Sequence, residues 1–375
     1  MGKAKVLVGM SGGIDSSVAA YLLREEGYDI QGVTMTLWKH GDSCSSASLK
    51  GDACFSPNEK NDVEKSRSVC RSLGISHFVL DIADCYERIV LRNFKDEYVA
   101  GRTPNPCVLC NEKIKFGALV EAARAKGVEF DFFATGHYAR IVSVGKRLAV
   151  AKAADPLKDQ SYFLYRLHQK QLNGVLFPLG EMTKSEVRKI DVKLGFHPEG
   201  QSESMDFYSG DYADLLDISP KKGNIVDVSG KVLGQHDGYW NYTIGQRRGI
   251  GIGGSEQPLY VLSIDPARNE ITVGSVDQAQ CGEVVAADLS FMGLDEHDAD
   301  SRTRSALVKI RSAGKPSSCR FSISKGQALI KFESPAFSPC CGQSAVAYDE
   351  DGVVLFGGVI ESVGGNSIVG LKSGN

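Results

Sequence analysis

Short apolar runs alternate with amphipathic stretches along the first third of the chain. The pattern predicts strands at about 5–10, 28–36, 76–81 and 131–135, and helices at about 15–26, 60–73, 83–99 and 113–126. Such alternation is typical of βαβ units, whose parallel sheet binds ligands at the carboxyl ends of its strands. We therefore expect an α/β fold with a doubly wound parallel sheet and a ligand site at that edge.

The pattern changes after about residue 218. Glycine becomes frequent, helical periodicity fades, and short β-branched runs appear at 224–228 and 353–356, with turn signals at Ser229-Gly230 and Glu350-Asp351-Gly352. These features predict small β domains instead of further βαβ units. We expect three domains, at 1–218, 219–283 and 284–375, with the last a β-barrel.

Composition narrows the class of protein. A chain of 375 residues with 42% hydrophobic residues is longer than one typical domain. It can bury packed cores without needing disulfides or structural metals for stability. The first residues lack a signal-like apolar region and no run is long enough to span a membrane, so we expect a soluble, cytoplasmic protein. In that compartment the ten cysteines would be reduced, which leaves them open to catalysis or metal binding.

The net charge of −3 argues against a globally basic nucleic-acid binder, but one stretch stands apart. Between Arg302 and Phe332 there are eight basic residues and no acid. A solvated face and a phosphate-binding patch both fit this run.

The first predicted strand runs directly into Ser11-Gly12-Gly13-Ile14-Asp15-Ser16-Ser17 and then a helix. Two glycines permit a tight turn that directs backbone N–H groups to one anion at the helix N-terminus. Asp15 could hold Mg²⁺ against the phosphates. The Walker loop needs a lysine and the Rossmann loop another glycine spacing, so neither matches. The match is to the PP-loop Ser-Gly-Gly-x-Asp-Ser, and the plainer alternative is a serine-rich helix cap.

A second segment combines prolines with a cysteine pair. In Gly101-Arg102-Thr103-Pro104-Asn105-Pro106-Cys107-Val108-Leu109-Cys110-Asn111 we expect an irregular loop that ends at the cysteines, followed by a helix carrying Lys113 and Lys115. A Cys-x-x-Cys pair can exchange sulfur through a persulfide or disulfide, ligate a metal or cluster, or be an inert buried pair.

Five segments in one order then identify a family. Together with the PP-loop and the proline-cysteine segment, the strings at 134–140 (Ala-Thr-Gly-His-Tyr-Ala-Arg), 158–164 (Lys-Asp-Gln-Ser-Tyr-Phe-Leu) and 242–249 (Tyr-Thr-Ile-Gly-Gln-Arg-Arg-Gly) resemble the bacterial tRNA-specific 2-thiouridylases. The resemblance covers nearly the whole chain. It implies that ATP adenylates O2 of the wobble uridine, that a sulfur nucleophile attacks C2, and that AMP leaves.

The resemblance also implies site residues. Cys110 matches the nucleophile of the family, and the ATP contacts map to Gly9, Met10, Ser11, Gly12, Gly13, Ile14, Asp15, Ser16, Met35 and Gly136. The central domain is expected to contact tRNA, and the tRNA contacts map to His137, Lys158, Asp159, Gln160, Arg311 and Gln343. A cysteine desulfurase or relay protein is expected as sulfur donor. Without the family, each of these side chains also fits an ordinary structural position.

The chain departs from the best-known branch at two catalytic positions. Cys107 stands where an aspartate is usual, and Asp206 replaces the second cysteine. Asp206 cannot carry sulfur, so two alternatives arise. Cys107 is the redox partner of Cys110, or both ligate an iron–sulfur cluster with Cys54 as third ligand.

Two other functional classes remain in competition with tRNA thiolation. A PP-loop ligase or amidase acting on a small molecule would share the ATP loop but would not need the cysteine pair. An RNA-binding module without catalysis would not need Ser11, Asp15 and Cys110.

Overall fold

The computed structural model describes residues 2–38, 55, 59–198, 200–201, 207–208, 212–216, 218–254, 257–296 and 302–364. The chain forms two compact units. Unit 1 comprises Met1–Arg92, Pro106–Asp211 and Asp351–Leu355, and unit 2 comprises Asn93–Asn105, Tyr212–Glu350 and Phe356–Asn375. The division into three domains at 218 and 283 stays a prediction.

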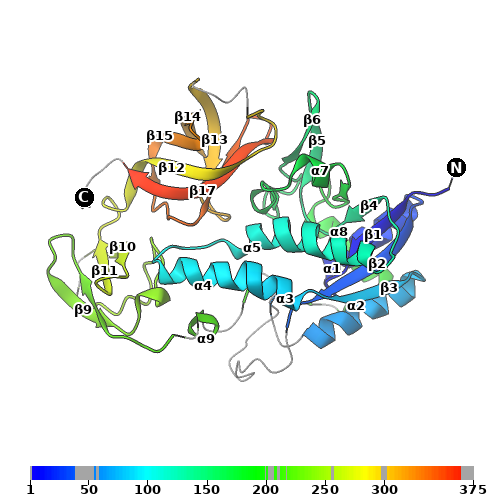
Figure 1. Cartoon of the computed structure of the whole chain (residues 1–375), viewed down its shortest axis with the longest axis horizontal. Coiled ribbons are helices and arrows are strands. Elements are labelled where there is room, and N and C mark those ends of the chain that lie inside the picture. Colours follow the sequence, from blue (N-terminus) through cyan, green and yellow to red (C-terminus); the bar gives the residue numbers. More distant parts are fainter. Residues whose placement is uncertain are drawn as a thin grey trace. The chain divides into compact units, whose positions relative to one another are not determined.

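Unit 1 is built on a parallel sheet with strand order β3-β2-β1-β4-β7 (Figure 1). Every neighbouring pair in it is parallel. The strands are β1 (Lys5–Gly9), β2 (Asp29–Thr36), β3 (His77–Asp81), β4 (Phe132–Ala134) and β7 (Val175–Leu176). The sequence places four of these strands within a residue or two, so the α/β prediction is confirmed. The chain order reverses between β1 and β4, which is where open α/β sheets bind ligands.

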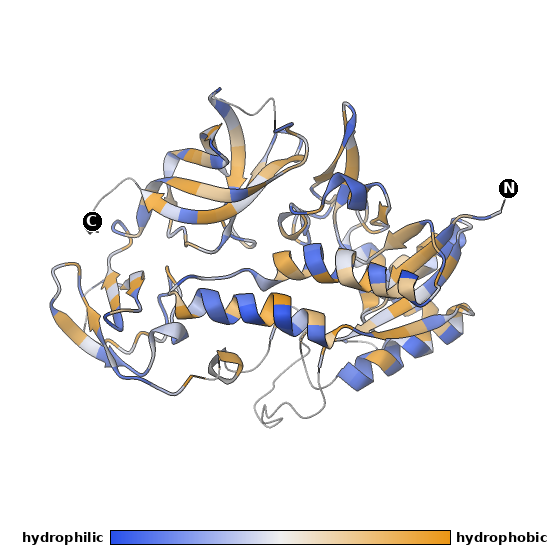
Figure 2. Ribbon diagram, viewed as in Figure 1, coloured by the Kyte–Doolittle hydropathy of each residue, from blue (hydrophilic) through white to orange (hydrophobic). Residues whose placement is uncertain are grey.

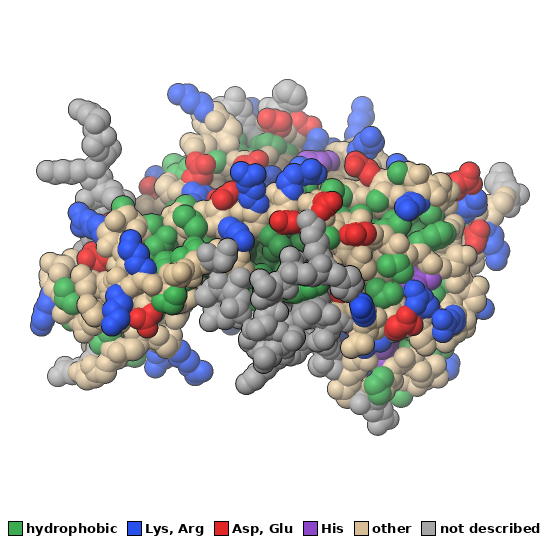
Figure 3. Space-filling model, turned by 60° about the horizontal axis from the view of Figure 1, so that its bottom comes forward, with side chains coloured by type: hydrophobic (Ala, Val, Ile, Leu, Met, Phe, Trp, Pro, Cys, Tyr) green, Lys and Arg blue, Asp and Glu red, His purple; other side chains and the backbone are tan. Residues whose placement is uncertain are grey.

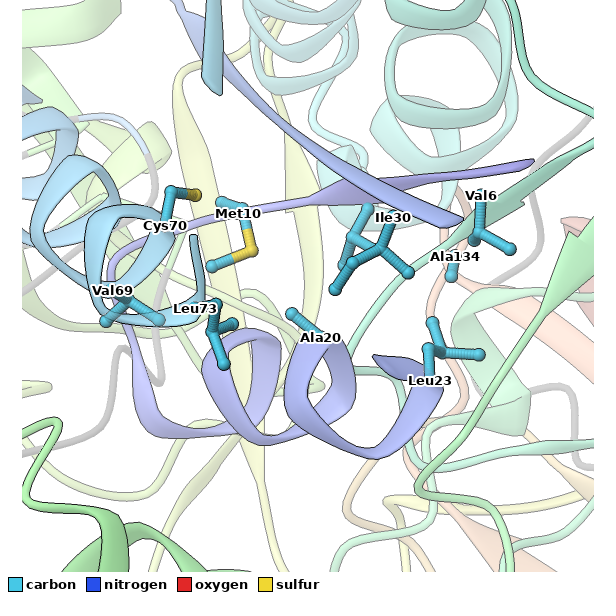
Figure 4. Close-up of a cluster of buried hydrophobic side chains, with 10 residues drawn as sticks. Val6, Met10, Ala20, Leu23, Ile30, Val69, Cys70, Leu73 and Ala134 are labelled. Carbon is cyan, nitrogen blue, oxygen red and sulfur yellow. The ribbon is translucent and has the colours of Figure 1, made fainter. Parts of the chain in front are cut away.

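One face of this sheet packs on α1 (Ile14–Glu25) and α2 (Glu59–Leu73) (Figure 4). Val6, Val8 and Ile30 from the strands meet Leu23 of α1 and Leu73 of α2, and all are at most 5% exposed. The hydrophobicity of these elements explains why they assemble: β1 carries the hydrophobic run Val6-Leu7-Val8, and α2 alternates hydrophobic and hydrophilic residues (Figure 2).

The opposite face carries a second layer of helices. Phe133 and Ala134 are neighbours on β4 and so point to opposite faces. Ala134 joins the cluster with α1, whereas the ring of Phe133 lies 5.6 Å from that of Phe116. Phe116 belongs to a helix made of α5 (Pro106–Leu109), the π-helical η2 (Cys110–Ala118) and α6 (Leu119–Ala125). The sheet is therefore covered on both faces, as expected.

The remaining elements of unit 1 follow β4 in the sequence, apart from one helix that follows β3. The hairpin β5 (Arg140–Val144) and β6 (Arg147–Ala151) precedes η3 (Ser161–Phe163), α7 (Gln169–Leu172) and α8 (Lys184–Leu194). A further helix starts as α3 (Ala83–Tyr86) and continues through the π-helical η1 (Glu87–Leu91) into α4 (Arg92–Val99), whose residues from Asn93 onward belong to unit 2. It confirms the prediction at 83–99.

Unit 2 contains a four-stranded sheet and a closed barrel. The sheet has the order β10-β11-β8-β9, and the barrel has the order β12-β15-β14-β13-β16-β17. Along β14, Cys319, Phe321 and Ile323 are buried while their neighbours are more exposed, so alternate residues fill the barrel. The expected final β-barrel is confirmed. The elements are α9 (Tyr212–Leu216), β8 (Gly223–Val226), β9 (Val232–His236), η4 (Tyr239–Asn241), β10 (Tyr260–Asp265), β11 (Glu270–Gly274), β12 (Gln280–Phe291), β13 (Arg304–Lys309), β14 (Ser317–Ser324), β15 (Gln327–Phe337), β16 (Ser344–Tyr348) and β17 (Val354–Gly364).

Candidate functional site

The loop between β1 and α1 is held by serine hydroxyls. The Ser16 hydroxyl accepts from the Ser11 N–H (3.2 Å) and donates to the Gly13 carbonyl (3.0 Å). The Ser17 hydroxyl donates to the same carbonyl (2.9 Å). Because the first N–H groups of α1 have no helical acceptor, this fixed loop presents them to an anion. The geometry of residues 10–16 suits an anion such as phosphate, and we refer to this loop as the cradle.

Two glycines are required by close backbone approach. Gly12 has φ +74°, and a Cβ there would lie 2.7 Å from the Asp62 carbonyl oxygen. A Cβ on Gly136 would lie 2.7 Å from the backbone carbon of Asp15 and 2.8 Å from the Ser16 nitrogen. The loop after β4 thus lies directly against the PP-loop. The structure brings Gly136 to the cradle, as the family resemblance implies.

Most of the other predicted ATP residues have a buried side chain or none, so only their backbone is open to a ligand. The side chains of Met10 and Ile14 are buried in hydrophobic clusters. Gly9 leaves room for the ring of Phe133, which would be 3.3 Å from a Cβ at that position. Met35 lies near the carboxyl end of β2 with a half-buried side chain. Only Ser11 and Asp15 keep exposed or half-exposed side chains in the loop.

The carboxylate of Asp15 is engaged by two donors. Its Oδ1 lies 2.7 Å from Nζ of Lys184 and accepts from the hydroxyl of Tyr138 at 2.8 Å. The Lys184 side chain is 9% exposed, and that of Asp15 is 32% exposed. A cation thus stands beside the cradle, and sequence reasoning missed it.

A buried histidine that follows α8 in the sequence supports the cradle. His197 Nε2 donates to the Gly12 carbonyl (3.1 Å), and its Nδ1 faces Oδ1 of Asp191 (2.7 Å). The ring thus links the Gly12 carbonyl, through one nitrogen, to the Asp191 carboxylate, through the other. Both side chains are almost fully buried. His197 therefore fixes the turn that Gly12 makes possible.

The cysteine pair lies inside a helix, which corrects our expectation of a loop. The helix begins at Pro106, where proline at the first helical position supplies a suitable φ and lacks an N–H that would be unsatisfied anyway. Cys107 is half-buried and Cys110 is buried. Residues at i and i+3 are neighbours on one helix face. The two thiols therefore share a face, as a redox pair, a pair of metal ligands or an inert buried pair would.

A buried carboxylate anchors this cysteine helix. Glu112, with a 2% exposed side chain, pairs with Nε of Arg166 at 2.6 Å and with Nζ of Lys113 at 2.7 Å. The amide of Gln171 donates to the carbonyls of Glu112 (3.1 Å) and Phe116 (3.0 Å). This network fixes the helix immediately after Cys110.

His137 is half-buried and packs among aromatic rings. Its Nδ1 lies 2.8 Å from the Thr135 hydroxyl, and its ring lies within 6.0 Å of those of Phe116 and Phe177. Burial, reinforced by the charge of Lys115, holds the pKa of His137 well below its usual range. It is therefore a neutral group at physiological pH.

The segment Lys158-Asp159-Gln160 forms a braced loop after β6. Asp159 Oδ1 accepts from the Ser161 N–H at 3.1 Å, and the Gln160 carbonyl oxygen Oε1 accepts from the Tyr138 N–H at 2.9 Å. Lys158 is half-buried. Asp159 and Gln160 thus hold the loop in place, and the loop carries Lys158.

Arg311 bridges two segments of unit 2. One terminal nitrogen donates to the carbonyls of Ile244 (2.8 Å) and Ser338 (2.5 Å). Gly245, with φ +82°, is needed there, because its Cβ would lie 2.9 Å from that nitrogen. Arg311 is half-buried and acts as a bracket within unit 2.

Gln343 makes comparable contacts. Its side-chain amide donates to the carbonyls of Thr103 (3.4 Å) and Pro104 (3.1 Å), all within unit 2. The Thr103 N–H in turn donates to the Cys341 carbonyl at 2.9 Å. Gln343 therefore secures the loop that precedes the cysteine helix in the sequence.

The basic run is distributed over barrel strands β13, β14 and β15. Lys309 is buried, Arg320 is exposed, and Lys331 lies 3.6 Å from Glu283. Because Lys309 is buried and Lys331 faces an acidic partner, the run is not a single uniform basic face. On the face of the molecule drawn in Figure 3, Lys and Arg side chains likewise lie among Asp and Glu side chains.

Cys54 and Asp206 lie outside the described residues. Among the residues that are described, no group of three or more His, Cys, Asp or Glu side chains is arranged to hold a metal ion. The described part of the chain also contains no helix long and apolar enough to cross a membrane.

Comparison with known proteins decides the family. Three family models match in succession: a tRNA methyl transferase HUP domain over residues 4–208, a tRNA methyl transferase PRC-barrel domain over 216–275, and an aminomethyltransferase beta-barrel domain over 282–360. The tRNA-specific 2-thiouridylase MnmA of Endomicrobium trichonymphae is 43% identical over 361 residues, which cover 95% of this chain and 98% of that one. The protein of the same name from Geotalea uraniireducens is 41% identical over 96% of this chain and 95% of its own. The chain belongs to the tRNA-specific 2-thiouridylase family. The resemblance drawn from five motifs is thereby confirmed.

The motifs in the sequence did not reveal several residues that support the candidate site. Lys184, Glu112 and Arg166 meet their partners across 169 and 54 residues of sequence. One local signal was available for Lys184, because Thr183 and Glu186 form a capping box that marks the start of α8.

Proposed function

We propose that this chain uses ATP to convert the wobble uridine of tRNA to 2-thiouridine. Full-length membership of the 2-thiouridylase family carries the proposal, together with an intact phosphate cradle. The curated relatives that share this family bear the name tRNA-specific 2-thiouridylase. The protein is thus an enzyme of tRNA sulfur transfer.

The cradle suits the triphosphate of ATP. Gly12 and Gly136 remove side chains from the approach to the loop, and the first turn of α1 offers N–H groups. Uridine O2 attacks the α-phosphorus, the bond from that phosphorus to the bridging oxygen breaks, and pyrophosphate leaves with the electron pair. The uracil N3 proton passes to solvent. This step turns a poor leaving group at C2 into AMP.

Mg²⁺ would accompany ATP. This ion favours one or two carboxylates combined with phosphate oxygens and water, in preference to an all-protein cage. Asp15 supplies one carboxylate at the cradle, which fits such a shared site. When bound, the ion supplies positive charge against the phosphates.

Sulfur delivery centres on Cys110. A sulfur nucleophile held at this position attacks C2, and the C2–O2 bond breaks to release AMP. With a persulfide on Cys110, attack of the Cys107 thiolate on the Cys110 Sγ would break the sulfur–sulfur bond, leave the terminal sulfur on C2 and form a Cys107–Cys110 disulfide. The donor of the sulfur is expected to be a cysteine desulfurase or a relay protein.

An iron–sulfur cluster is the alternative. Cys107, Cys110 and Cys54 would supply three thiolates and leave one iron for a sulfide. Cluster binding predicts iron and inorganic sulfide in anaerobic preparations, and their loss in Cys54→Ala, Cys107→Ala and Cys110→Ala. If native protein without iron still thiolates tRNA, the cluster is ruled out and the Cys107–Cys110 disulfide route is supported.

The function is tested by measuring AMP and pyrophosphate release with and without tRNA, followed by mass spectrometry of the tRNA nucleosides. We expect tRNA to stimulate release and 2-thiouridine to accumulate when a sulfur donor is present. Release stimulated by a small amide acceptor, with no response to tRNA, would instead identify a PP-loop ligase or amidase.

A further inference from the structure

The first residue of α8 directs a buried cation at the PP-loop. Thr183 and Glu186 cap the helix reciprocally, with the Thr183 N–H donating to Glu186 Oε2 at 2.7 Å. The N–H of Lys184 donates to Oδ2 of Asp155 at 2.9 Å. The capping box fixes the residue before Lys184 and the Asp155 carboxylate fixes its own N–H, so the side chain extends from a rigid base.

The environment of the Lys184 ammonium lowers the stability of α8. Its Nζ lies 2.7 Å from Asp15 Oδ1 and 5.8 Å from the centre of the Tyr138 ring, and its side chain is 9% exposed. Burying an ion pair carries a desolvation penalty, and a cation at a helix N-terminus opposes the helix dipole. A role in the stability of α8 thus does not account for this lysine.

Its position fits an anion in the cradle. Asp15 lies in the first turn of α1, so a phosphate bound at that helix end comes close to its carboxylate. The Tyr138 hydroxyl already donates to the same Oδ1, so Asp15 keeps one donor if the ammonium departs. A polyphosphate offers more negative charge than one carboxylate and can compete for the ammonium.

We propose that Lys184 binds phosphate groups of ATP during the adenylation step. This assignment rests on the proposed function. Its ammonium moves from Asp15 to the β- and γ-phosphates of ATP and stabilises pyrophosphate as it leaves. The bond between the α-phosphorus and the bridging oxygen breaks with its electron pair on pyrophosphate, while uridine O2 bonds to the α-phosphorus. Lys184 stays protonated throughout and transfers no proton.

Binding of ATP and AMP to the full-length protein separates this role from a structural one. AMP lacks the two phosphates that Lys184 is proposed to bind. Lys184→Met should weaken ATP binding by about 10- to 100-fold, the effect of a charge-assisted contact, and leave AMP affinity close to that of the wild type. Lys189→Met is the matched control, because it removes an exposed lysine from the same helix and should change neither affinity.

A second variant guards against misfolding. Lys184→Gln removes the charge but retains a donor for Asp15, and it should show the same selective loss of ATP affinity with a wild-type melting temperature. Equal weakening of ATP and AMP, or unchanged ATP affinity in both variants, would overturn the assignment. If ATP affinity is unchanged in the variants while the wild type thiolates tRNA, only Lys184 is wrongly assigned. If the wild type itself binds no ATP, the proposed function fails with it.

Discussion

The cradle of unit 1 and the turn at 338–343 of unit 2, with the neighbouring Arg311, both include residues that we expect to bind a ligand. In both, those side chains already have partners within the protein. At the cradle, Asp15 is paired with the Lys184 ammonium, a charge that a phosphate can take over. At the turn, Arg311 and Gln343 donate to backbone carbonyls, and these hydrogen bonds hold loops of unit 2 together.

The two regions differ in whether a bound ligand can replace the contacts that these side chains already make. A carboxylate–ammonium pair can be divided between a metal ion and a phosphate without leaving either charge unpaired. Breaking bonds to backbone carbonyls leaves polar groups unsatisfied and loosens the loops they hold. We therefore expect substitutions at the cradle to act mainly on catalysis, and substitutions at the turn to act first on stability.

The largest effect is expected at Asp15. Asp15→Asn removes the charge that orients Lys184 and the carboxylate offered to Mg²⁺, so tRNA thiolation should fall by about 100- to 1000-fold, as for other preorganised electrostatic groups. The rate is measured in single turnover at saturating ATP. Thiolation close to the wild-type rate would show that the pair at the cradle is not part of the reaction.

A smaller effect, on stability, is expected at Arg311. Arg311→Met removes hydrogen bonds from a charged donor to the carbonyls of Ile244 and Ser338, which should lower the free energy of unfolding by about 1.5–3 kcal/mol. Gln343→Leu removes neutral hydrogen bonds and should cost about 1–2 kcal/mol. Urea unfolding measures both.

Arg320→Met controls for the lost charge. Arg320 is exposed on barrel strand β14, so its replacement should change the unfolding free energy by less than about 0.5 kcal/mol. tRNA binding is compared in all three variants. If Arg311→Met loses tRNA affinity but unfolds like the wild type, Arg311 is an RNA contact and not a bracket.

The smallest effect is the pH dependence contributed by His137. Burial lowers the pKa of this histidine in the folded state, so below about pH 6.5 the unfolded chain binds a proton that the folded chain does not. Stability from this group is fully present above pH 6.5 and is lost as the pH falls toward the folded-state pKa. The slope is at most about 1.4 kcal/mol per pH unit.

His137→Gln should flatten this dependence between pH 7 and 5.5 in thermal or urea unfolding. Part of the slope should persist, because burial also lowers the pKa of His77 and His236. An unchanged slope would mean that His137 is protonated equally in the folded and unfolded states.

Much of unit 1 could be predicted because its signals are local. Hydrophobic periodicity located β1 and α1, and the Ser-Gly-Gly-x-Asp-Ser spacing located the cradle between them. The partners of the cradle could not be predicted in this way. Lys184 and Asp15 are 169 residues apart, and only the packing of α8 against α1 brings them together.

The start of the cysteine helix was misplaced for a specific physical reason. Two prolines within three residues predict a loop, since the residue before a proline avoids helical geometry. Pro106 itself suits the first helical position, so the helix begins there and includes Cys107 and Cys110. The salt bridge that anchors this helix, between Glu112 and Arg166, spans 54 residues and left no local pattern.

In the proposed reaction ATP activates the uridine oxygen itself. A tRNA carrying ¹⁸O at O2 of the wobble uridine, incubated with ATP, Mg²⁺ and a sulfur donor, reports the fate of that oxygen. If adenylation precedes sulfur attack, each 2-thiouridine formed should yield one AMP that carries ¹⁸O in its phosphate. Formation of 2-thiouridine with unlabelled AMP would contradict the account.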